Sequence, residues 1–208
     1  MKKANEIEQV QVKAPNIKRV EFSITGTAPY VQLRFSEKSI NTMKDKMAAG
    51  TVAKGKKVRE ARDFEADYEG AKHYSTEGWL GIPASAFRAA LIDACRLVGY
   101  KMTMAKMSVF ILPDGFDAVD GTPLVRIEGA PEMCQHHVRN ATGVADIRIR
   151  SMWRKWNVTL HVSYDADQFT VTDVTNLLAR VGQQVGIGEG RPFSKNSVGM
   201  GWGTFDVM

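Results

Sequence analysis

Residues 181–205 read VGQQVGIGEGRPFSKNSVGMGWGTF, and the rest of the fold is organised around this stretch. It is too rich in glycine for a helix or a central strand, because glycine loses much backbone entropy on folding and has no side chain to bury. The glycines are Gly186, Gly188, Gly190, Gly199, Gly201 and Gly203. We therefore predict a loop, called here the glycine loop (residues 186–203), with positive φ angles and a close approach to something else.

Polar and basic residues indicate what the glycine loop approaches. Arg191 and Lys195 lie between the glycines, and Ser194, Asn196 and Ser197 surround Lys195. Bare amides beside such cations favour an anion, for example a phosphodiester backbone. A purely structural hairpin of glycines remains the alternative.

The spacing of the first three glycines, G-x-G-x-G, superficially resembles a dinucleotide fingerprint. A dinucleotide-binding loop follows a strand and opens a helix. This loop follows a helical pattern and precedes a strand pattern, so we do not expect a dinucleotide cofactor. No other cofactor is expected.

Length, charge and cysteine content indicate which class of protein this chain belongs to. With 208 residues, the chain is long enough for one substantial core. The net charge of +5 favours polyanionic partners, although surface lysines also serve solubility. The sequence has no apolar run of the ~20 residues that a membrane helix needs, and no signal peptide at its start, so a cytoplasmic protein without a membrane partner is expected. Cys95 and Cys134 stand singly, which predicts small buried residues and no metal site.

The first half of the chain changes character twice. Residues 1–16 are polar and without period, which predicts a flexible N-terminal arm before a single domain over 17–208. Apolar residues alternate over 17–24 and again over 31–35, as in half-buried strands. An insertion at about 36–78 is rich in basic residues. It is interpreted either as a solvated, partly helical insertion or as a mobile basic finger that folds over a nucleic-acid strand.

Two helices and four further strands are predicted after the insertion. The first helix begins at Pro83, carries apolar residues at helical spacing and ends at Gly99. The second follows a capping box of Thr170 and Asp173. Strands are predicted at 107–112, 124–127, 158–164 and 202–207, with a shorter alternating run at 146–150 and an irregular polar stretch at 129–142.

The main order is strand, helix, strand, strand, helix, strand. It predicts an α+β fold of the ferredoxin-like or RRM-like type, an antiparallel sheet with two helices on one face and a large basic insertion. An open sheet of this kind is a common platform for single-stranded nucleic acid.

Three segments carry a resemblance to a known family. Residues 81–91, GIPASAFRAAL, are similar to the opening of the first helix in the RAMP superfamily, the RRM-like proteins of CRISPR effector complexes. Residues 139–164 are similar to the central part of CRISPR backbone subunits, where an arginine- and threonine-bearing loop leads into a long strand. Residues 186–205 resemble the glycine-rich loop before the last strand. The chain looks like a compact, phage-borne or mobile-element relative of these subunits.

The resemblance implies a protein that binds single-stranded RNA, in preference to DNA, along its backbone. It further implies a homo-oligomer that grows into a helical filament on the strand, with other effector-complex subunits as partners. The expected nucleic-acid-binding residues are Lys54, Lys56, Lys57, Arg59, Arg88, Arg139, Arg148, Arg150, Arg154, Lys155, Gly188, Gly190, Arg191 and Lys195. Trp153 and Trp156 either stack on bases or belong to the core.

The sequence is also compatible with two functions other than non-enzymatic binding of single-stranded nucleic acid. The first is a metal-independent endoribonuclease of the RAMP type that uses His136 or His137 as general acid or base. No partner for either histidine is identifiable, so no catalytic residue is assigned. The second alternative is a protein-docking module that mimics a subunit of a larger complex.

Overall fold

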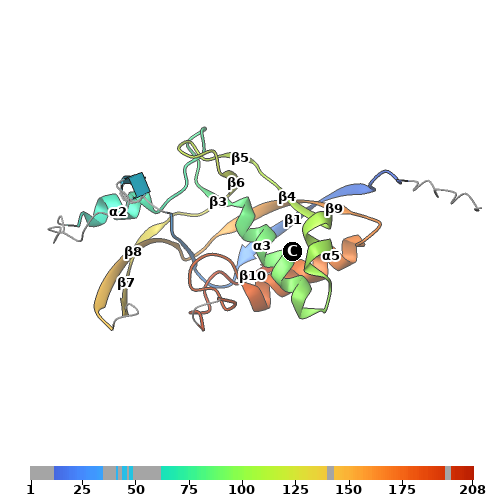
Figure 1. Ribbon diagram of the computed structural model, residues 1–208. Coiled ribbons are helices and arrows are strands. Elements are labelled where there is room, and N and C mark those ends of the chain that lie inside the picture. The colour runs from blue at the N-terminus through green and yellow to red at the C-terminus, as the bar shows by residue number, and fades with distance from the viewer. Residues whose placement is uncertain are drawn as a thin grey trace, which may run out of the picture.

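The computed structural model describes residues 12–34, 62–139, 143–194 and 198–208, together with Asn41, Lys44, Asp45, Met47 and Ala48. The described part is α+β with antiparallel sheets (Figure 1). Its four-stranded sheet has the order β10–β1–β9–β4, and every neighbouring pair is antiparallel. The strands are β1 (Ile17–Gly26), β4 (Val109–Leu112), β9 (Asn157–Asp165) and β10 (Phe205–Val207).

Strands β1 and β9 are the two central strands of this sheet, and their pairing runs from Ile17↔Asp165 to Thr25↔Asn157. Val158, Leu160 and Val162 alternate toward the core and are at most 2% exposed. The period-2 pattern therefore predicted both strands correctly. At the far edge, β4 begins at Val109, because the preceding residues form helix α4 (Met102–Ser108), so the predicted strand start at residue 107 is wrong.

Helices α3 (Ala84–Leu97) and α5 (Val171–Arg180) contact each other, and they contact β4 and β10 respectively. The predicted capping box is present, since Thr170 and Asp173 bond each other's backbone amides at the start of α5. A π-helical turn, η1 (Val181–Val185), follows α5. Pro83 is the N-cap of α3 and not its first residue, because it still pairs with Leu124 as the last residue of β3.

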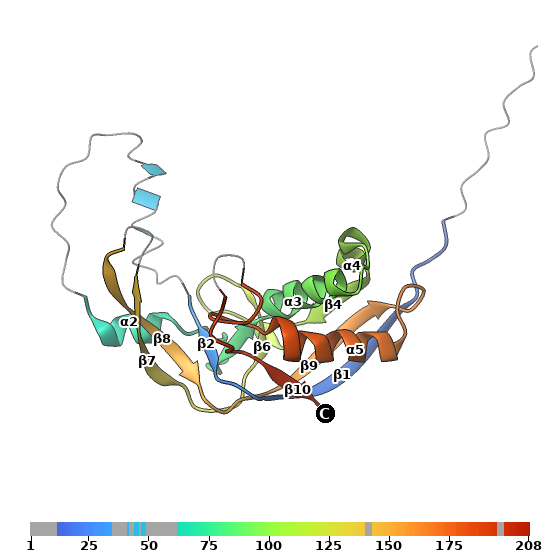
Figure 2. The ribbon, with the colours of Figure 1, turned by 90° about the horizontal axis from the view of Figure 1, so that it is seen from below.

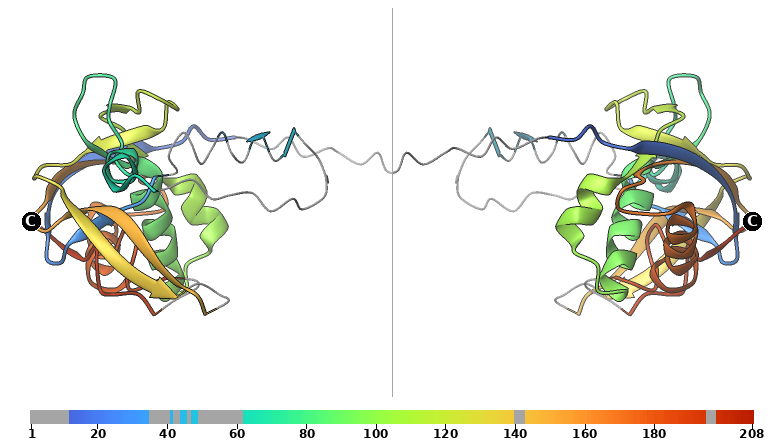
Figure 3. Two further views of the ribbon diagram at one scale, coloured as in Figure 1. Left: turned by 90° about the vertical axis from the view of Figure 1, so that its left-hand side faces the viewer. Right: turned by 90° about the vertical axis from the view of Figure 1, so that its right-hand side faces the viewer.

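A second sheet has the order β2–β8–β7, with β2 (Tyr30–Gln32), β8 (Ala145–Trp153) and β7 (Glu132–Arg139). The β7–β8 hairpin and helix α2 (Phe64–Gly70) lie at one end of the molecule, opposite α4 and α5 (Figure 2). The end-on views show the strands curving, with α3 inside the curve (Figure 3). Strand β7 replaces most of the irregular stretch predicted at 129–142. Neither face of β7 is fully buried, since half-buried Cys134, His136 and Val138 alternate with exposed Gln135 and His137, so the apolar pattern is weak.

A small third sheet, β3–β6–β5, completes the described part. Its strands are β3 (Gly81–Pro83), β6 (Pro123–Arg126) and β5 (Gly115–Phe116). Strand β6 confirms the predicted strand at 124–127 within one residue. None of the helices among the described residues is long and apolar enough to cross a membrane.

Trp153 and Trp156 join the first two sheets. They are 0% and 2% exposed, and both rings pack on Tyr30 at centroid distances of 5.6 and 5.8 Å. The indole N–H of Trp156 donates to the carbonyl of Ala28 at 2.9 Å. Both tryptophans are therefore core residues, and the alternative that they stack on bases is wrong.

Candidate nucleic-acid interface

The glycine loop is fastened to the segment that leads from β1 into β2. All six of its glycines have φ between 68° and 78°, as the sequence predicted. The amide of Glu189 donates to the carbonyl of Val31 at 2.9 Å, and the amide of Gly203 donates to that of Pro29 at 2.8 Å. At Gly188, a Cβ atom would lie 2.5 Å from the carbonyl oxygen of Val31. The loop therefore approaches β2 more closely than any side chain allows.

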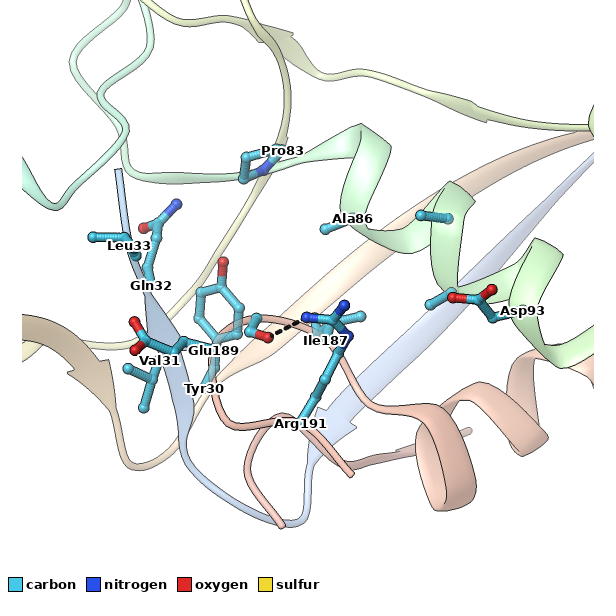
Figure 4. Close-up of a pocket in the computed structure, with 13 residues that line it drawn as sticks. Tyr30, Val31, Gln32, Leu33, Pro83, Ala86, Asp93, Ile187, Glu189 and Arg191 are labelled. Atoms are coloured by element: carbon cyan, nitrogen blue, oxygen red, sulfur yellow. Dashed lines mark hydrogen bonds between the residues drawn. The ribbon is translucent and has the colours of Figure 1, made fainter. Parts of the chain in front are cut away.

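A cavity of about 380 Å³ opens between β2, α3 and the glycine loop (Figure 4). Helix α3 contributes a face of small residues, Ala86, Ala89 and Ala90, followed by Asp93. The glycine loop contributes Arg191, whose guanidinium donates to the carbonyl of Gly188 at 3.0 Å. Because the alanine side chains are small, they leave an open volume between α3 and the glycine loop, which Asp93 and Arg191 line.

Tyr30 forms the back of this cavity. Its side chain is packed between tryptophans and the residue is only 2% exposed, but its hydroxyl points across the cavity toward α3 (Figure 4). Among the described residues the Tyr30 hydroxyl has no hydrogen-bond partner. Burial raises the pKa of the Tyr30 phenol above its ordinary value, so the group remains an O–H donor at neutral pH.

The N-terminus of α3 faces the same volume, since Pro83 and Ala86 line it. The N-cap, Pro83, makes no side-chain hydrogen bond to the helix, and the first turn contains no acidic residue. The first backbone N–H groups of a helix have no partner within the helix and carry the positive end of its dipole. The cavity thus lies near the N-terminus of α3 and is lined by a phenol donor and a guanidinium, which favour an anionic ligand, and also by the carboxylates of Asp93 and Glu189.

The two arginines of β8 are held by a carboxylate of the glycine loop. Arg150 is 9% exposed and binds both carboxylate oxygens of Glu189, while a third N–H donates to the carbonyl of Ile149 at 2.8 Å. Arg148 lies 3.7 Å from the same carboxylate and is more exposed. Glu189 therefore neutralises much of the positive track that was predicted along β8.

The other predicted residues do not gather at one place. Arg88 donates to the carbonyls of Val109 and Lys106 and lies 4.9 Å from the ring centroid of Phe110, so it braces β4 and α4. Arg154 pairs with Glu132 on the surface, and Lys155 is exposed. The predictions for Lys54, Lys56, Lys57, Arg59, Lys195 and the side chain of Arg139 lie outside the described residues.

The two candidate catalytic histidines lie on β7. His136 is half-buried with its ring 5.5 Å from that of Trp202, and His137 is exposed. Within the described part of the chain, neither imidazole contacts a carboxylate or another histidine. The described residues also contain no group of three or more His, Cys, Asp or Glu side chains placed to hold a metal ion.

A buried histidine was not singled out from the sequence. His73 lies 2.8 Å from Asp117, whose second carboxylate oxygen lies 3.2 Å from Arg34. All three side chains are at most 10% exposed. This network ties the segment after β2 to the residue that follows β5.

The sequence also did not predict three residues that line the cavity: Tyr30, Asp93 and Glu189. Tyr30 directly precedes the alternating run at 31–35 and Asp93 is a polar residue on a helix, so neither had a local feature to mark it.

No protein-family model matches the chain, and no curated protein matches it.

Proposed function

We propose that this protein binds single-stranded nucleic acid, RNA in preference to DNA, by holding its sugar-phosphate backbone in the cavity between β2, α3 and the glycine loop. The observation that carries the proposal is the convergence of three kinds of donor on one volume: the α3 N-terminus, the Tyr30 hydroxyl and Arg191. Phosphate oxygens accept from all three. Such contacts position a strand without reading its sequence, so binding is weakly sequence-dependent.

We also infer a ferredoxin-like core. Numbered along the chain, the strands β1, β4, β9 and β10 lie side by side in the order fourth, first, third, second. Helix α3 lies between the first and second of them, and α5 between the third and fourth. This order and the contact between the two helices support the RRM-like arrangement that the resemblance to RAMP proteins implies.

The same resemblance supports an assembly. Copies of the chain would line up along one strand by head-to-tail contacts, which propagate because a heterologous interface need not close. In this proposal the protein is a compact relative of CRISPR effector backbone subunits, carried by a phage or mobile element. Longer oligonucleotides would then give proportionally larger complexes on size-exclusion chromatography.

Replacing Arg191 by alanine tests the cavity. We expect the affinity for a fluorescent single-stranded 40-mer to fall about tenfold, because one charge-assisted contact to phosphate is lost. The slope of log Kd against log salt should also fall by about one charge equivalent. Tyr30→Phe removes only the hydroxyl and should weaken binding to a smaller extent. The matched control is Arg180→Ala, on the exposed surface of α5, which should leave affinity unchanged.

Three outcomes would contradict the proposal. Absence of binding at low salt would remove the nucleic-acid function and favour the protein-docking alternative. Equal effects of Arg191→Ala and Arg180→Ala would place the strand elsewhere. Cleavage of the RNA that disappears in His136→Ala/His137→Ala would favour the endoribonuclease.

A further inference from the structure

Asp93 is a feature of the cavity wall that phosphate binding does not explain. It follows the alanine face of α3, is half-buried, and lines the same cavity as Arg191 (Figure 4). Within the described residues, its carboxylate takes part in no hydrogen bond and no ion pair. A carboxylate repels a phosphodiester, so its presence weakens binding unless it receives a hydrogen bond from the ligand.

The backbone of nucleic acid offers one group that meets this need. Phosphate and sugar ring oxygens are acceptors only, and an ionised carboxylate is also an acceptor only. The ribose 2′-hydroxyl is the sole donor of the RNA backbone, and the DNA backbone has none. The 2′-hydroxyl adjoins the 3′-phosphate of the same nucleotide, and Asp93 and Arg191 line the same cavity from α3 and from the glycine loop.

We propose that Asp93 accepts a hydrogen bond from the 2′-hydroxyl of a nucleotide whose phosphate is held by Arg191, so that this cavity selects RNA over DNA. The inference rests on the proposed function and adds the sugar that the site takes. A volume of about 380 Å³ accommodates a sugar with its phosphate. The Tyr30 hydroxyl, which points into the same cavity, also makes no hydrogen bond to the described residues.

The test uses three fluorescent 20-mers of one sequence, built with uracil throughout: RNA, DNA with deoxyuridine, and 2′-O-methyl RNA. The oligonucleotides differ only at the 2′ position. The wild-type protein should bind RNA about tenfold more tightly than the other two, the difference made by one hydrogen bond to a charged group. The methyl ether tests donation specifically, because it keeps the oxygen and removes the proton.

Asp93→Ala should lower the affinity for RNA about tenfold and leave the affinity for DNA unchanged or raised, because the loss concerns the 2′-hydroxyl alone. The control is Asp206→Ala on β10, which changes net charge equally at an exposed position away from the cavity and should keep the RNA preference.

Two results would overturn the inference while leaving the binding of single-stranded nucleic acid in the cavity intact. One is equal affinity of the wild-type protein for RNA and DNA, which also removes the proposed preference for RNA. The other is a preference for RNA that survives Asp93→Ala. If the wild-type protein binds none of the three oligonucleotides, the proposed function itself fails and the inference fails with it.

Discussion

Replacing Glu189 by alanine should lower the free energy of unfolding by about 3–5 kcal/mol, the usual cost of removing one partner from a buried ion pair. The variant leaves the guanidinium of Arg150 buried, with the carbonyl of Ile149 as its one remaining acceptor among the described residues. Water cannot compensate fully, because the Arg150 side chain is 11% exposed. Unfolding in urea, followed by circular dichroism, measures the change.

A matched variant, Glu132→Ala, separates the effect of burying an ion pair from the effect of losing a negative charge. Glu132→Ala also deprives an arginine of its carboxylate, but Arg154 and Glu132 are 68% and 46% exposed. Exposed pairs of this kind contribute less than about 1 kcal/mol. If both variants lose the same stability, the description of Arg150 as a buried cation neutralised by the glycine loop is wrong.

Gly203→Ala should be the most damaging small substitution in the glycine loop. Its φ is 69°, and a Cβ atom would lie 1.8 Å from the carbonyl oxygen of Ile187. The backbone must shift, which disturbs the hydrogen bonds that join Gly203 to Pro29 and Ile187. We expect a loss of about 3 kcal/mol or more in the free energy of unfolding, because strain and steric overlap add.

Gly201 provides the control for backbone conformation. Its φ of 74° is nearly the same, but a Cβ atom there would meet no atom of the described residues within 4 Å. Gly201→Ala should therefore cost only the strain of a positive φ, about 1 kcal/mol. Equal losses at the two positions would show that the loop does not approach Ile187 as described.

Much of the fold could be predicted because its elements carry local patterns. Strand β9 alternates cleanly, and Thr170 with Asp173 marks the start of α5. Strand β7 could not be predicted, since its stability comes from pairing with β8 and not from a buried face. Helix α4 was missed because its sequence, MTMAKMS, adjoins an apolar strand and is only seven residues long.

The glycines and Arg191 stood out by composition, and of these Gly188 and Arg191 line the cavity. That they bind nucleic acid stays a prediction. Tyr30 and Asp93 come from β2 and α3, and only the folded chain brings them to the same volume. The partner of Arg150 could not be foreseen either, because Glu189 lies 39 residues further along the chain. That Arg148 and Arg150 bind nucleic acid stays a prediction.

Hydrogen–deuterium exchange with and without a single-stranded RNA 40-mer tests the central claim most directly. If the strand lies in the cavity, RNA should slow exchange in residues 28–34, in the first turn of α3 and around Gly188 and Arg191. These segments form the walls of the cavity, and their amides lose contact with water on binding. Slowing confined to the β4 and β9 surface, with no change in the three cavity segments, would contradict the account.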